Sequence, residues 1–372
     1  MSAFSEKCGG SCAYDLADVN SEGPDGVPDV IMAKSDGTTQ ALTSVAAGLL
    51  SESRRAAFDG FSQIPAPFFG DWDGDGTTDV VMCCKNSELL VALDDPVTGL
   101  TVSGTTTGLS ASASTSTVAL VDLNNDGILD VVTGGWYGAL VPLAFYTRSS
   151  ADLALTSVTA ADVGIDLSAI TPLAGSDLTA TPVDWNSDGR MDLVIFGGTG
   201  WDAGSAAFLI ENTGTGWTTH TGATNPFDGI FCPSACKPAA TSDPEHWCRV
   251  DIVDFDADGD LDVFTWATPC GLTVFQNDGS TLSELTTLPT DVDSKVILLP
   301  WTGAGMPWSG AITSQHLRAT FYDQNGDGLA DFGAGSDVAQ VRFFLRGACE
   351  MANPCTGHGG CHPYAGTCAC LE

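Results

Sequence analysis

Basic residues are scarce in this chain, in which 13 Lys and Arg stand against 47 Asp and Glu among 372 residues. The formal net charge of -34 repels phosphate backbones and anionic membrane surfaces, so we expect no nucleic-acid partner. No apolar stretch approaches the roughly 20 residues that cross a bilayer, and residues 1–10 lack the apolar core of a signal peptide. We therefore expect no direct membrane insertion.

Recognisable catalytic signatures are missing as well. The five histidines are His220, His246, His316, His358 and His362. None of them belongs to an H-E-x-x-H, nucleophile-elbow or paired acid–base pattern. Neither an Arg-Gly-Asp sequence nor an Asn-x-Ser/Thr sequon occurs in the chain. We therefore expect a binding protein and not an enzyme.

Long amphipathic helical patterns are also hard to find. The chain instead has 43 Gly, 18 Pro and many Val, Thr and Ala positions, which together predict short strands joined by tight turns. The sequence thus favours the all-β class. Its length allows either two ordinary domains or one large closed assembly of repeats.

An Asp-rich loop followed by a hydrophobic run recurs six times along the chain. In chain order we name these segments loops 1 to 6, and they cover residues 18–29, 71–79, 122–130, 184–192, 254–262 and 323–331. Loops 2 to 6 fit the pattern D-x-[DN]-x-D-G-x-x-D without gaps, whereas loop 1 has three extra residues before Asp25. A β-rich run such as residues 80–82 or 193–196 follows the loop.

The side chains at positions 1, 3, 5 and 9 and the backbone carbonyl at position 7 offer the oxygen ligands that a hard cation prefers. The glycine at position 6 allows the sharp turn that directs these ligands inward. Ca²⁺ suits such a set better than Mg²⁺, which takes fewer protein ligands and keeps its waters. We predict up to six Ca²⁺, held by Asp18, Asn20, Asp25, Asp29, Asp71, Asp73, Asp75, Thr77, Asp79, Asp122, Asn124, Asp126, Ile128, Asp130, Asp184, Asn186, Asp188, Arg190, Asp192, Asp254, Asp256, Asp258, Asp260, Asp262, Asp323, Asn325, Asp327, Leu329 and Asp331.

The EF-hand is the main alternative for such a loop, because it begins similarly but ends with a bidentate Glu at position 12 and lies between helices. Position 12 of loops 2 to 6 is Met82, Thr133, Ile195, Thr265 and Ala334. The EF-hand is therefore excluded. Six Ca²⁺ would change the formal charge from -34 to -22, and without them the carboxylates of each loop repel one another. We therefore expect a structural role for calcium.

The spacing of the loops predicts a β-propeller. The first Asp residues of successive loops are 53, 51, 62, 70 and 69 residues apart. Each interval fits about four short strands, which form one blade. We predict six four-stranded blades, or seven if one blade lacks a calcium loop. If the ring closes from Gly347 to the start of the chain, the interval from Asp323 round to Asp18 is only 42 residues. We therefore expect the N-terminal segment to complete the last blade.

The Asp-rich loop followed by a strand resembles the FG-GAP/VCBS repeat of integrin α-subunit propellers and related fungal lectins. The resemblance covers roughly Cys8 to Gly347, so we assign residues 1–347 to the propeller. It implies a ligand site on the face opposite the calcium loops. It also implies that seven blades are the commonest number in such proteins.

The end of the chain forms a separate cysteine-rich segment, residues 348–372, with Cys349, Cys355, Cys361, Cys368 and Cys370. These resemble five of the six cysteines of an EGF-like module. The resemblance implies that Cys349 pairs with Cys361, and that Cys355 pairs with Cys368. Cys370 would then pair with a cysteine beyond residue 372, so we expect the chain to be part of a longer multidomain protein.

The 13 cysteines are too many for a reduced cytosolic protein without a metal cluster, so we expect disulfides and an extracellular location, secreted or at the cell surface. One group offers a zinc site as an alternative: Cys232, Cys236, His246 and Cys248. Its irregular spacing and Pro-rich surroundings favour a disulfide-stapled loop.

Gly-rich turns with aromatic residues are predicted on the face opposite the calcium loops, because successive strands of a blade run antiparallel. Such turns offer a ligand flat apolar surfaces beside polar groups. The candidate ligand residues are Trp136, Tyr137, Trp201, Asp202 and Trp266. In contrast, Trp72, Trp185 and Phe255 recur at position 2 of their loops, so we expect them to pack between blades.

The sequence thus predicts an extracellular, calcium-stabilised recognition module for adhesion or for lectin-like carbohydrate binding. Its partner is expected to be a glycan or an extracellular protein. The alternative is a calcium-dependent polysaccharide-active enzyme, a lyase or a hydrolase, because such enzymes also use calcium propellers.

Overall fold

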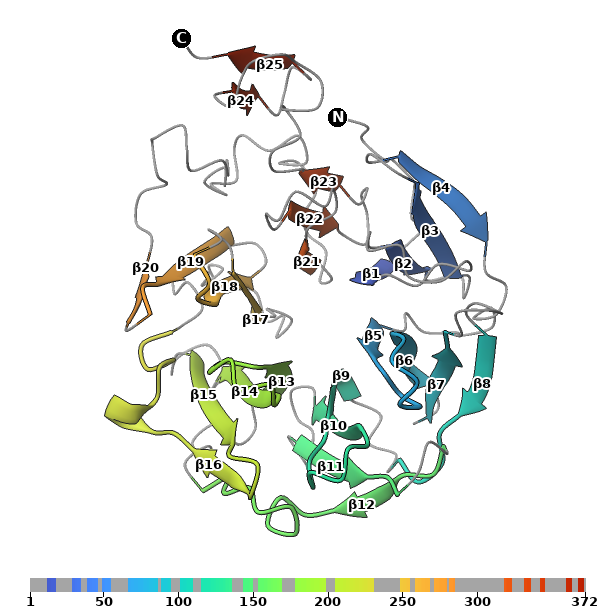
Figure 1. The fold of residues 1–372 in the computed structure, drawn as a ribbon, viewed down its shortest axis with the longest axis vertical. Helices are drawn as coiled ribbons and strands as arrows, with labels where there is room; N and C mark the ends of the chain where they lie inside the picture. Colours follow the sequence, from blue (N-terminus) through green and yellow to red (C-terminus); the bar gives the residue numbers. More distant parts are fainter. Residues whose placement is uncertain are drawn as a thin grey trace, which may run out of the picture.

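The structure is a computed structural model. It describes residues 12–17, 29–34, 39–45, 49–54, 66–85, 88–94, 101–109, 115–135, 143–149, 153–168, 178–198, 205–230, 248–254, 258–267, 271–279, 281–284, 318–322, 331–335, 342–344, 359–362 and 367–370. Within them, six antiparallel sheets are arranged as a ring (Figure 1). Each sheet is a meander, in which strands consecutive in the chain are hydrogen-bonded neighbours.

The first three sheets hold the N-terminal half of the ring. Their strands are β1 (Cys12–Ala17), β2 (Asp29–Lys34), β3 (Thr39–Val45) and β4 (Leu49–Arg54); β5 (Ala66–Gly70), β6 (Asp79–Lys85), β7 (Glu88–Leu93) and β8 (Thr101–Thr105); and β9 (Thr115–Val121), β10 (Asp130–Gly135), β11 (Leu143–Thr147) and β12 (Thr156–Val158). β-Branched and other apolar residues fill the middle strands, as predicted for the runs that follow the loops.

The next three sheets complete the ring. Their strands are β13 (Leu178–Val183), β14 (Asp192–Gly198), β15 (Ser205–Asn212) and β16 (Trp217–Thr219); β17 (Cys248–Val253), β18 (Asp262–Ala267), β19 (Gly271–Asn277) and β20 (Leu282–Glu284); and β21 (Arg318–Tyr322), β22 (Asp331–Gly335) and β23 (Arg342–Phe344). Among the described residues the sixth sheet thus has three strands.

The Asp-rich loops occupy the same place in every blade, between the first and the second strand. The Asp at position 9 is the first residue of the second strand, and it pairs in register with the last residue of the first strand. In the first blade Asp29 lies opposite Ala17, and in the sixth Asp331 lies opposite Tyr322. Loop 1 therefore joins the first two strands of its blade in the same register as the other loops, despite its three extra residues.

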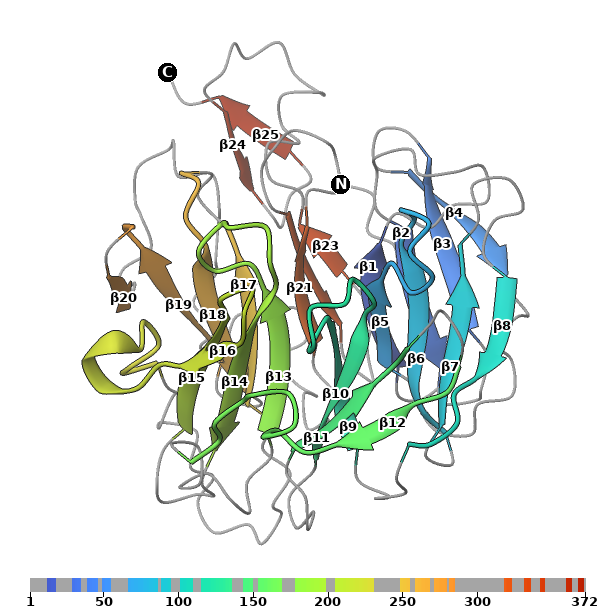
Figure 2. The same ribbon diagram turned by 60° about the horizontal axis from the view of Figure 1, so that its bottom comes forward.

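The six sheets close into a β-propeller. The first strand of each blade is innermost, and it contacts the first strands of both neighbouring blades all the way round, including β21 with β1. Figure 2 shows the strands running between the two faces of the ring. The prediction of six blades is thus confirmed.

The predicted completion of the last blade by the N-terminal segment is not found in the described part of the chain. Cys12–Ala17 forms the innermost strand of the first blade, because loop 1 needs a strand before it. Residues 1–11 lie outside the described residues. The ring closes there through contact between the inner strands of the first and sixth blades.

A hairpin of β24 (Gly359–His362) and β25 (Thr367–Cys370) lies outside the ring (Figure 1). Cys361 lies opposite Cys368 in its register, and the EGF-like pairing of the cysteines stays a prediction. The described residues include no α-helix and one short 3-10 helix, η3 (Gly222–Thr224). No helix among them is long and apolar enough to cross a membrane.

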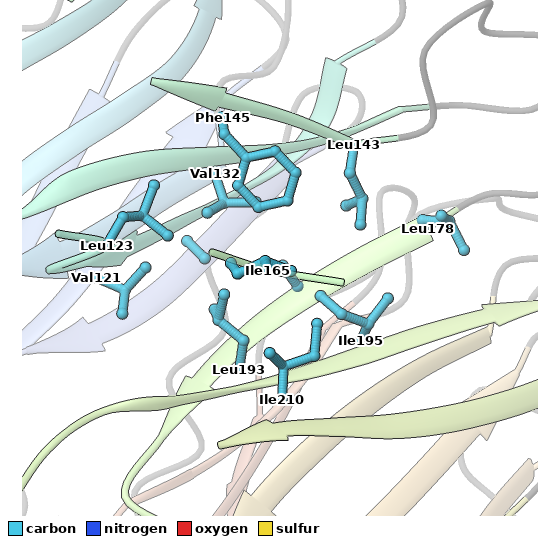
Figure 3. Close-up of a cluster of buried hydrophobic side chains, with 12 residues drawn as sticks. Val121, Leu123, Val132, Leu143, Phe145, Ile165, Leu178, Leu193, Ile195 and Ile210 are labelled. Carbon is cyan, nitrogen blue, oxygen red and sulfur yellow. The ribbon is translucent and has the colours of Figure 1, made fainter. Parts of the chain in front are cut away.

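The hydrophobic core lies between neighbouring blades. Between the third and fourth blades, apolar side chains from the two sheets face one another (Figure 3): Val121, Leu123, Val132, Leu143 and Phe145 meet Leu178, Leu193, Ile195 and Ile210, with Ile165 among them. Each such side chain stabilises the fold by about 1.5–3 kcal/mol when fully buried. Packing between blades, and not within one sheet, therefore holds the ring together.

The aromatic residues at position 2 take part in these interfaces, as predicted. Trp72 is 1% exposed and lies in a core cluster with side chains of the third blade, among them Val118 and Tyr146. Trp185 packs against the cluster between the fourth and fifth blades, with its ring centroid 4.6 Å from that of Phe227. Phe255 lies outside the described residues.

Candidate metal sites

The carboxylate at position 1 shapes each described loop. In loop 2, Asp71 Oδ1 accepts hydrogen bonds from the backbone N–H groups of Gly74 and Asp75 at 2.7 and 3.0 Å, and its Oδ2 accepts one from Gly76 at 3.0 Å. In loops 3 and 4, positions 5 and 6 donate to the same carboxylate at 2.8–3.1 Å. In loop 5, position 6 donates to it at 3.1 Å. The loop thus coils around the position 1 side chain.

The side chains at positions 3 and 5 each accept the backbone N–H two residues further on. In loop 2, Asp73 accepts from Asp75 at 3.2 Å and Asp75 accepts from Thr77 at 2.8 Å. The equivalent distances in loops 3 and 4 are 2.9–3.1 Å, and position 5 of loop 5 makes its bond at 2.9 Å. These Asx turns fix the direction of each side chain.

The backbone is left-handed at position 6, as the sequence predicts. The φ angle is +92° at Gly76, +84° at Gly127, +86° at Gly189 and +98° at Gly259. Position 4 is left-handed too, with φ of +81° at Gly74 and +57° at both Asn125 and Ser187. The loop pattern does not anticipate this second turn, although Gly and Asn at position 4 are residues that tolerate it.

The Asp at position 9 links its loop to the third strand of the same blade. Asp79, Asp130, Asp192 and Asp262 are all 0% exposed. In loops 2 to 4 one oxygen accepts the N–H of position 2, at 2.6, 3.0 and 3.1 Å. In loops 2 to 5 the other oxygen accepts the N–H of the residue at the end of the third strand, at 2.7–2.8 Å from Asp94, Arg148, Asn212 and Asn277.

Burial raises the pKa of three of these carboxyl groups. It raises the pKa of Asp79 and of Asp130 to about 6, because the cost of desolvating the charge exceeds the benefit of the N–H donors. Burial also raises the pKa of Asp192. The pKa of Asp73 is raised by burial and by the neighbouring carboxylate of Asp75. A bound cation would relieve both effects.

We expect the metal-free protein to become more stable on mild acidification. A folded-state pKa of about 6 for Asp79 and Asp130 lies above the unfolded value near 3.8, so the stabilising contribution of protonation is fully present below about pH 4 and is lost as pH rises through 6. In EDTA the melting temperature should therefore be higher at pH 5.0 than at pH 7.5. A lower value at pH 5.0 would contradict this, and the double variant D79N/D130N should flatten the dependence.

The residues present fit a hard cation. In loop 2, carboxylate oxygens of Asp71, Asp73 and Asp79 lie within 4.8 Å of one another. In loop 5, Oδ1 of Asp254 is buried and has no hydrogen-bond partner among the described residues. A buried carboxylate oxygen without a donor is costly, and an all-oxygen, acidic ligand set is the one that Ca²⁺ prefers.

Not every predicted ligand lies in the described part of the chain. Those that fall outside it are Asp18, Asn20, Asp25, Asp256, Asp323, Asn325, Asp327 and Leu329. Asp29 and Asp331 are placed as the first residues of β2 and β22. The structure brings together the predicted residues of loops 2, 3 and 4, and most of those of loop 5.

Each of loops 2 and 3 also accepts hydrogen bonds from the next blade. Arg148, 3% exposed at the end of β11, donates from Nη2 to the carbonyl of Trp72 at 2.9 Å and lies 3.6 Å from the centroid of the Trp72 ring. Trp217 in the fourth blade donates to the carbonyl of Leu123 at 2.9 Å, and Asn212 donates to Asn125 Oδ1 at 3.1 Å. The loops are thus part of the interfaces between blades.

The predicted ligand residues are only partly placed. Trp136, Tyr137, Trp201 and Asp202 lie outside the described residues, just after the ends of β10 and β14. Trp266 lies within β18, opposite Arg249 and Leu272 in register, and not in a turn. The second strands end at the face opposite the loops, and the ligand role of these residues stays a prediction.

Residues 17–82 match the sequence model of the FG-GAP-like repeat family. The match begins one residue before loop 1 and ends three residues after loop 2, so it spans β2 to β4 of the first blade and, in the second blade, β5, loop 2 and the start of β6. None of the curated protein sequences matches the chain.

Solved structures with this fold have sequences that differ widely from this chain. A mutant of AofleA from Arthrobotrys oligospora is 11% identical over 93% of this chain and 87% of that chain, with a TM-score of 0.52. A mutant of Aleuria aurantia lectin in complex with alpha-methyl-L-fucoside is 11% identical over 92% of this chain and 94% of that chain, with a TM-score of 0.48. The likeness to AofleA supports the overall fold.

Proposed function

We propose that this chain is an extracellular recognition module whose β-propeller is stabilised by calcium. The observation that supports the calcium part most directly is repetition. In loops 2 to 5 the carboxylate of position 1 accepts the backbone N–H of position 6, and the carboxylate of position 9 is buried. Four separate Asp-rich turns would not share this scheme if they were only solvated surface loops.

In this proposal the side chains at positions 1, 3, 5 and 9 and the carbonyl at position 7 hold the cation. Bound Ca²⁺ supplies positive charge that neutralises the repelling carboxylates of its loop. The chain's own groups do the rest, since position 9 joins the loop to the third strand, and the neighbouring blade donates to the carbonyl at position 2. Calcium would thus stabilise both a blade and its interface.

For the ligand we propose a glycan or an extracellular protein, bound on the face opposite the loops. The support is topological, because the second strands carry the chain from the loops to that face, and Trp136 and Trp201 follow the ends of two of them in the sequence. The scarcity of basic residues is compatible with a neutral glycan as the ligand and argues against a polyanionic ligand. A propeller presents such turns from neighbouring blades side by side.

A glycan array screened in calcium and in EDTA tests this function. We expect at least one glycan class to bind in calcium, to lose binding in EDTA, and to remain chemically unchanged after long incubation. W136A and W201A should each weaken the binding about 3- to 10-fold, the range of a lost aromatic contact, whereas W185F on the loop side should not.

The other outcomes of the array are equally informative. Cleavage of the bound glycan would show that the protein is a polysaccharide-active enzyme and not a recognition module. Binding that survives both tryptophan variants would overturn the proposed face. No binding to any glycan would remove carbohydrate from the proposal and leave an extracellular protein as the ligand.

A further inference from the structure

Loop 4 has an unusual residue at position 7. The residues at that position in the five ungapped loops are Thr77, Ile128, Arg190, Asp260 and Leu329. Arg190 is the only basic residue in any of the six loops. A guanidinium is permanently charged and cannot be removed by titration in a protein. Loop 4 therefore carries its own cation beside the carboxylates that are proposed to hold calcium.

Arg190 is held in place within the loop. Its Nη2 forms an ion pair with Oδ2 of Asp188, the residue at position 5. Its Nε donates to the carbonyl of Asn212, the last residue of β15, at 2.9 Å. The side chain passes beside Gly214, where a Cβ would lie in ordinary van der Waals contact with Nε of Arg190, at 3.4 Å. The guanidinium thus joins the loop to the end of the third strand.

The same link is made without a charge in loop 2. There the hydroxyl of Thr77 lies 2.6 Å from Oδ1 of Asp75 and also contacts the carbonyl of Asp94, and its single proton is shared between these two acceptors. The backbone N–H of Thr77 goes to that same Oδ1, so Oδ2 of Asp75 accepts no hydrogen bond from any described residue. In loop 2 the position 5 carboxylate therefore keeps one oxygen for a cation.

In loop 4 both oxygens of the position 5 carboxylate have partners. Oδ1 of Asp188 accepts the backbone N–H of Arg190 at 3.0 Å, and Oδ2 is held by the guanidinium. At position 3, Nδ2 of Asn186 donates to Glu211 at 3.2 Å, and its Oδ1 accepts the backbone N–H of Asp188 as in the other loops. A metal ion entering loop 4 must displace the guanidinium and then remain close to its positive charge.

We propose that Arg190 takes the place of calcium in loop 4, so that this loop stays folded without metal and binds Ca²⁺ more weakly than loops 2, 3 and 5. This inference rests on the proposed calcium function and deepens it. The ligand side chains carry four negative charges in loop 2 and three in loop 3, whereas in loop 4 three carboxylates are offset by one guanidinium. A charge a few ångströms from the metal in a partly exposed site changes affinity by about tenfold or more.

Terbium luminescence can isolate loop 4, because Tb³⁺ binds oxygen-rich calcium sites and is excited by a nearby indole, here Trp185 at position 2. The loop 4 signal is the part that W185F abolishes, and its displacement by Ca²⁺ gives the affinity of that loop. We expect R190T, which installs the residue of loop 2, to raise the Ca²⁺ affinity of loop 4 at least tenfold. R190K, which keeps the charge, should stay within about threefold of wild type.

Thermal unfolding gives a second readout that does not depend on terbium. In EDTA, R190T should melt at a lower temperature than wild type, because loop 4 has then lost its internal cation. In 10 mM Ca²⁺ the difference should shrink or vanish, because calcium now fills the loop. An M191L variant, which changes an exposed neighbour of Arg190 that holds no ligand position, serves as the matched control and should show neither change.

The outcomes separate this inference from the function on which it rests. If wild type binds Tb³⁺ and Ca²⁺ at other loops but R190T leaves the affinity of loop 4 unchanged, the role of Arg190 is overturned and calcium binding stands. If R190K gains as much affinity as R190T, charge is not the cause and the inference also fails. If neither wild type nor R190T binds any Ca²⁺, the calcium proposal itself fails.

Discussion

Transfer from 10 mM Ca²⁺ into EDTA is expected to lower the melting temperature of this protein by roughly 10–20 °C. Extracellular calcium sites have dissociation constants of about 0.1–1 mM, so at 10 mM each site stabilises the folded state by about 1.4–2.7 kcal/mol. Six sites would give about 8–16 kcal/mol. Unfolding a chain of 372 residues changes the entropy by about 0.8 kcal/mol per kelvin, which converts this energy into that shift.

Differential scanning calorimetry in the two buffers measures this shift, with MgCl₂ at 10 mM as the control. Magnesium should restore little of the lost stability, because it dehydrates reluctantly and fits an all-protein oxygen cage poorly. Equal melting temperatures in calcium and in EDTA would contradict a structural role for calcium. Equal protection by magnesium would contradict the predicted ion.

Substitution R148M is expected to destabilise the propeller by about 3–5 kcal/mol. Arg148 is buried between the second and third blades, where it donates to the carbonyls of Trp72 and Leu129 and covers the Trp72 ring. Methionine fills much of the same volume but donates no hydrogen bond. The buried carbonyl of Trp72 and the partly buried carbonyl of Leu129 would each lose a donor, at about 1–3 kcal/mol each, and the cation–π contact of about 0.5–2 kcal/mol would be lost as well.

Urea unfolding of R148M at constant 10 mM Ca²⁺ measures the loss. R148K is the matched variant, because it keeps the positive charge but its compact ammonium lacks the planar fork with which the guanidinium reaches both carbonyls, so its loss should be intermediate. The backbone N–H of residue 148 still reaches Asp130 in both variants, so loop 3 keeps its tie to the third strand. A loss below 0.5 kcal/mol in R148M would show that the contact between the blades is not a stabilising one.

Much of the fold could be predicted from the sequence, because the signal repeats. The loop pattern locates the turn between the first two strands in every blade, and the register confirms it even for loop 1, where Asp29 pairs with Ala17. The spacing of the loops gives the six blades. The recurrence of Trp72 and Trp185 at position 2 correctly places them between blades.

The contacts that join the loops to their surroundings could not be predicted. The backbone donors to the position 9 carboxylates lie 15 to 20 residues further along the chain, at Asp94, Arg148, Asn212 and Asn277. They have no residue type in common to all four, because they act through the N–H group, which every residue except proline has. A pattern in side chains cannot reveal such a partner.

The sequence also did not indicate that a side chain of the loop itself can take the place of the metal ion. Arg190 was predicted as a ligand only through its carbonyl, and its guanidinium lies against Asp188. Position 7 has no fixed residue type, so its side chain is free to differ between loops. The consequence becomes visible only when the loop is folded and the side chain is seen to reach both Asp188 and Asn212.

A crystal structure tests the central claim most directly, if the crystals are grown in 10 mM Ca²⁺ and anomalous diffraction is measured at a long X-ray wavelength at which calcium scatters anomalously. We predict an anomalous peak inside loops 2, 3 and 5, bound by the side chains of positions 1, 3, 5 and 9 and the carbonyl of position 7, with a weaker peak in loop 4. Well-ordered loops without any anomalous peak would contradict the assignment of calcium to this propeller.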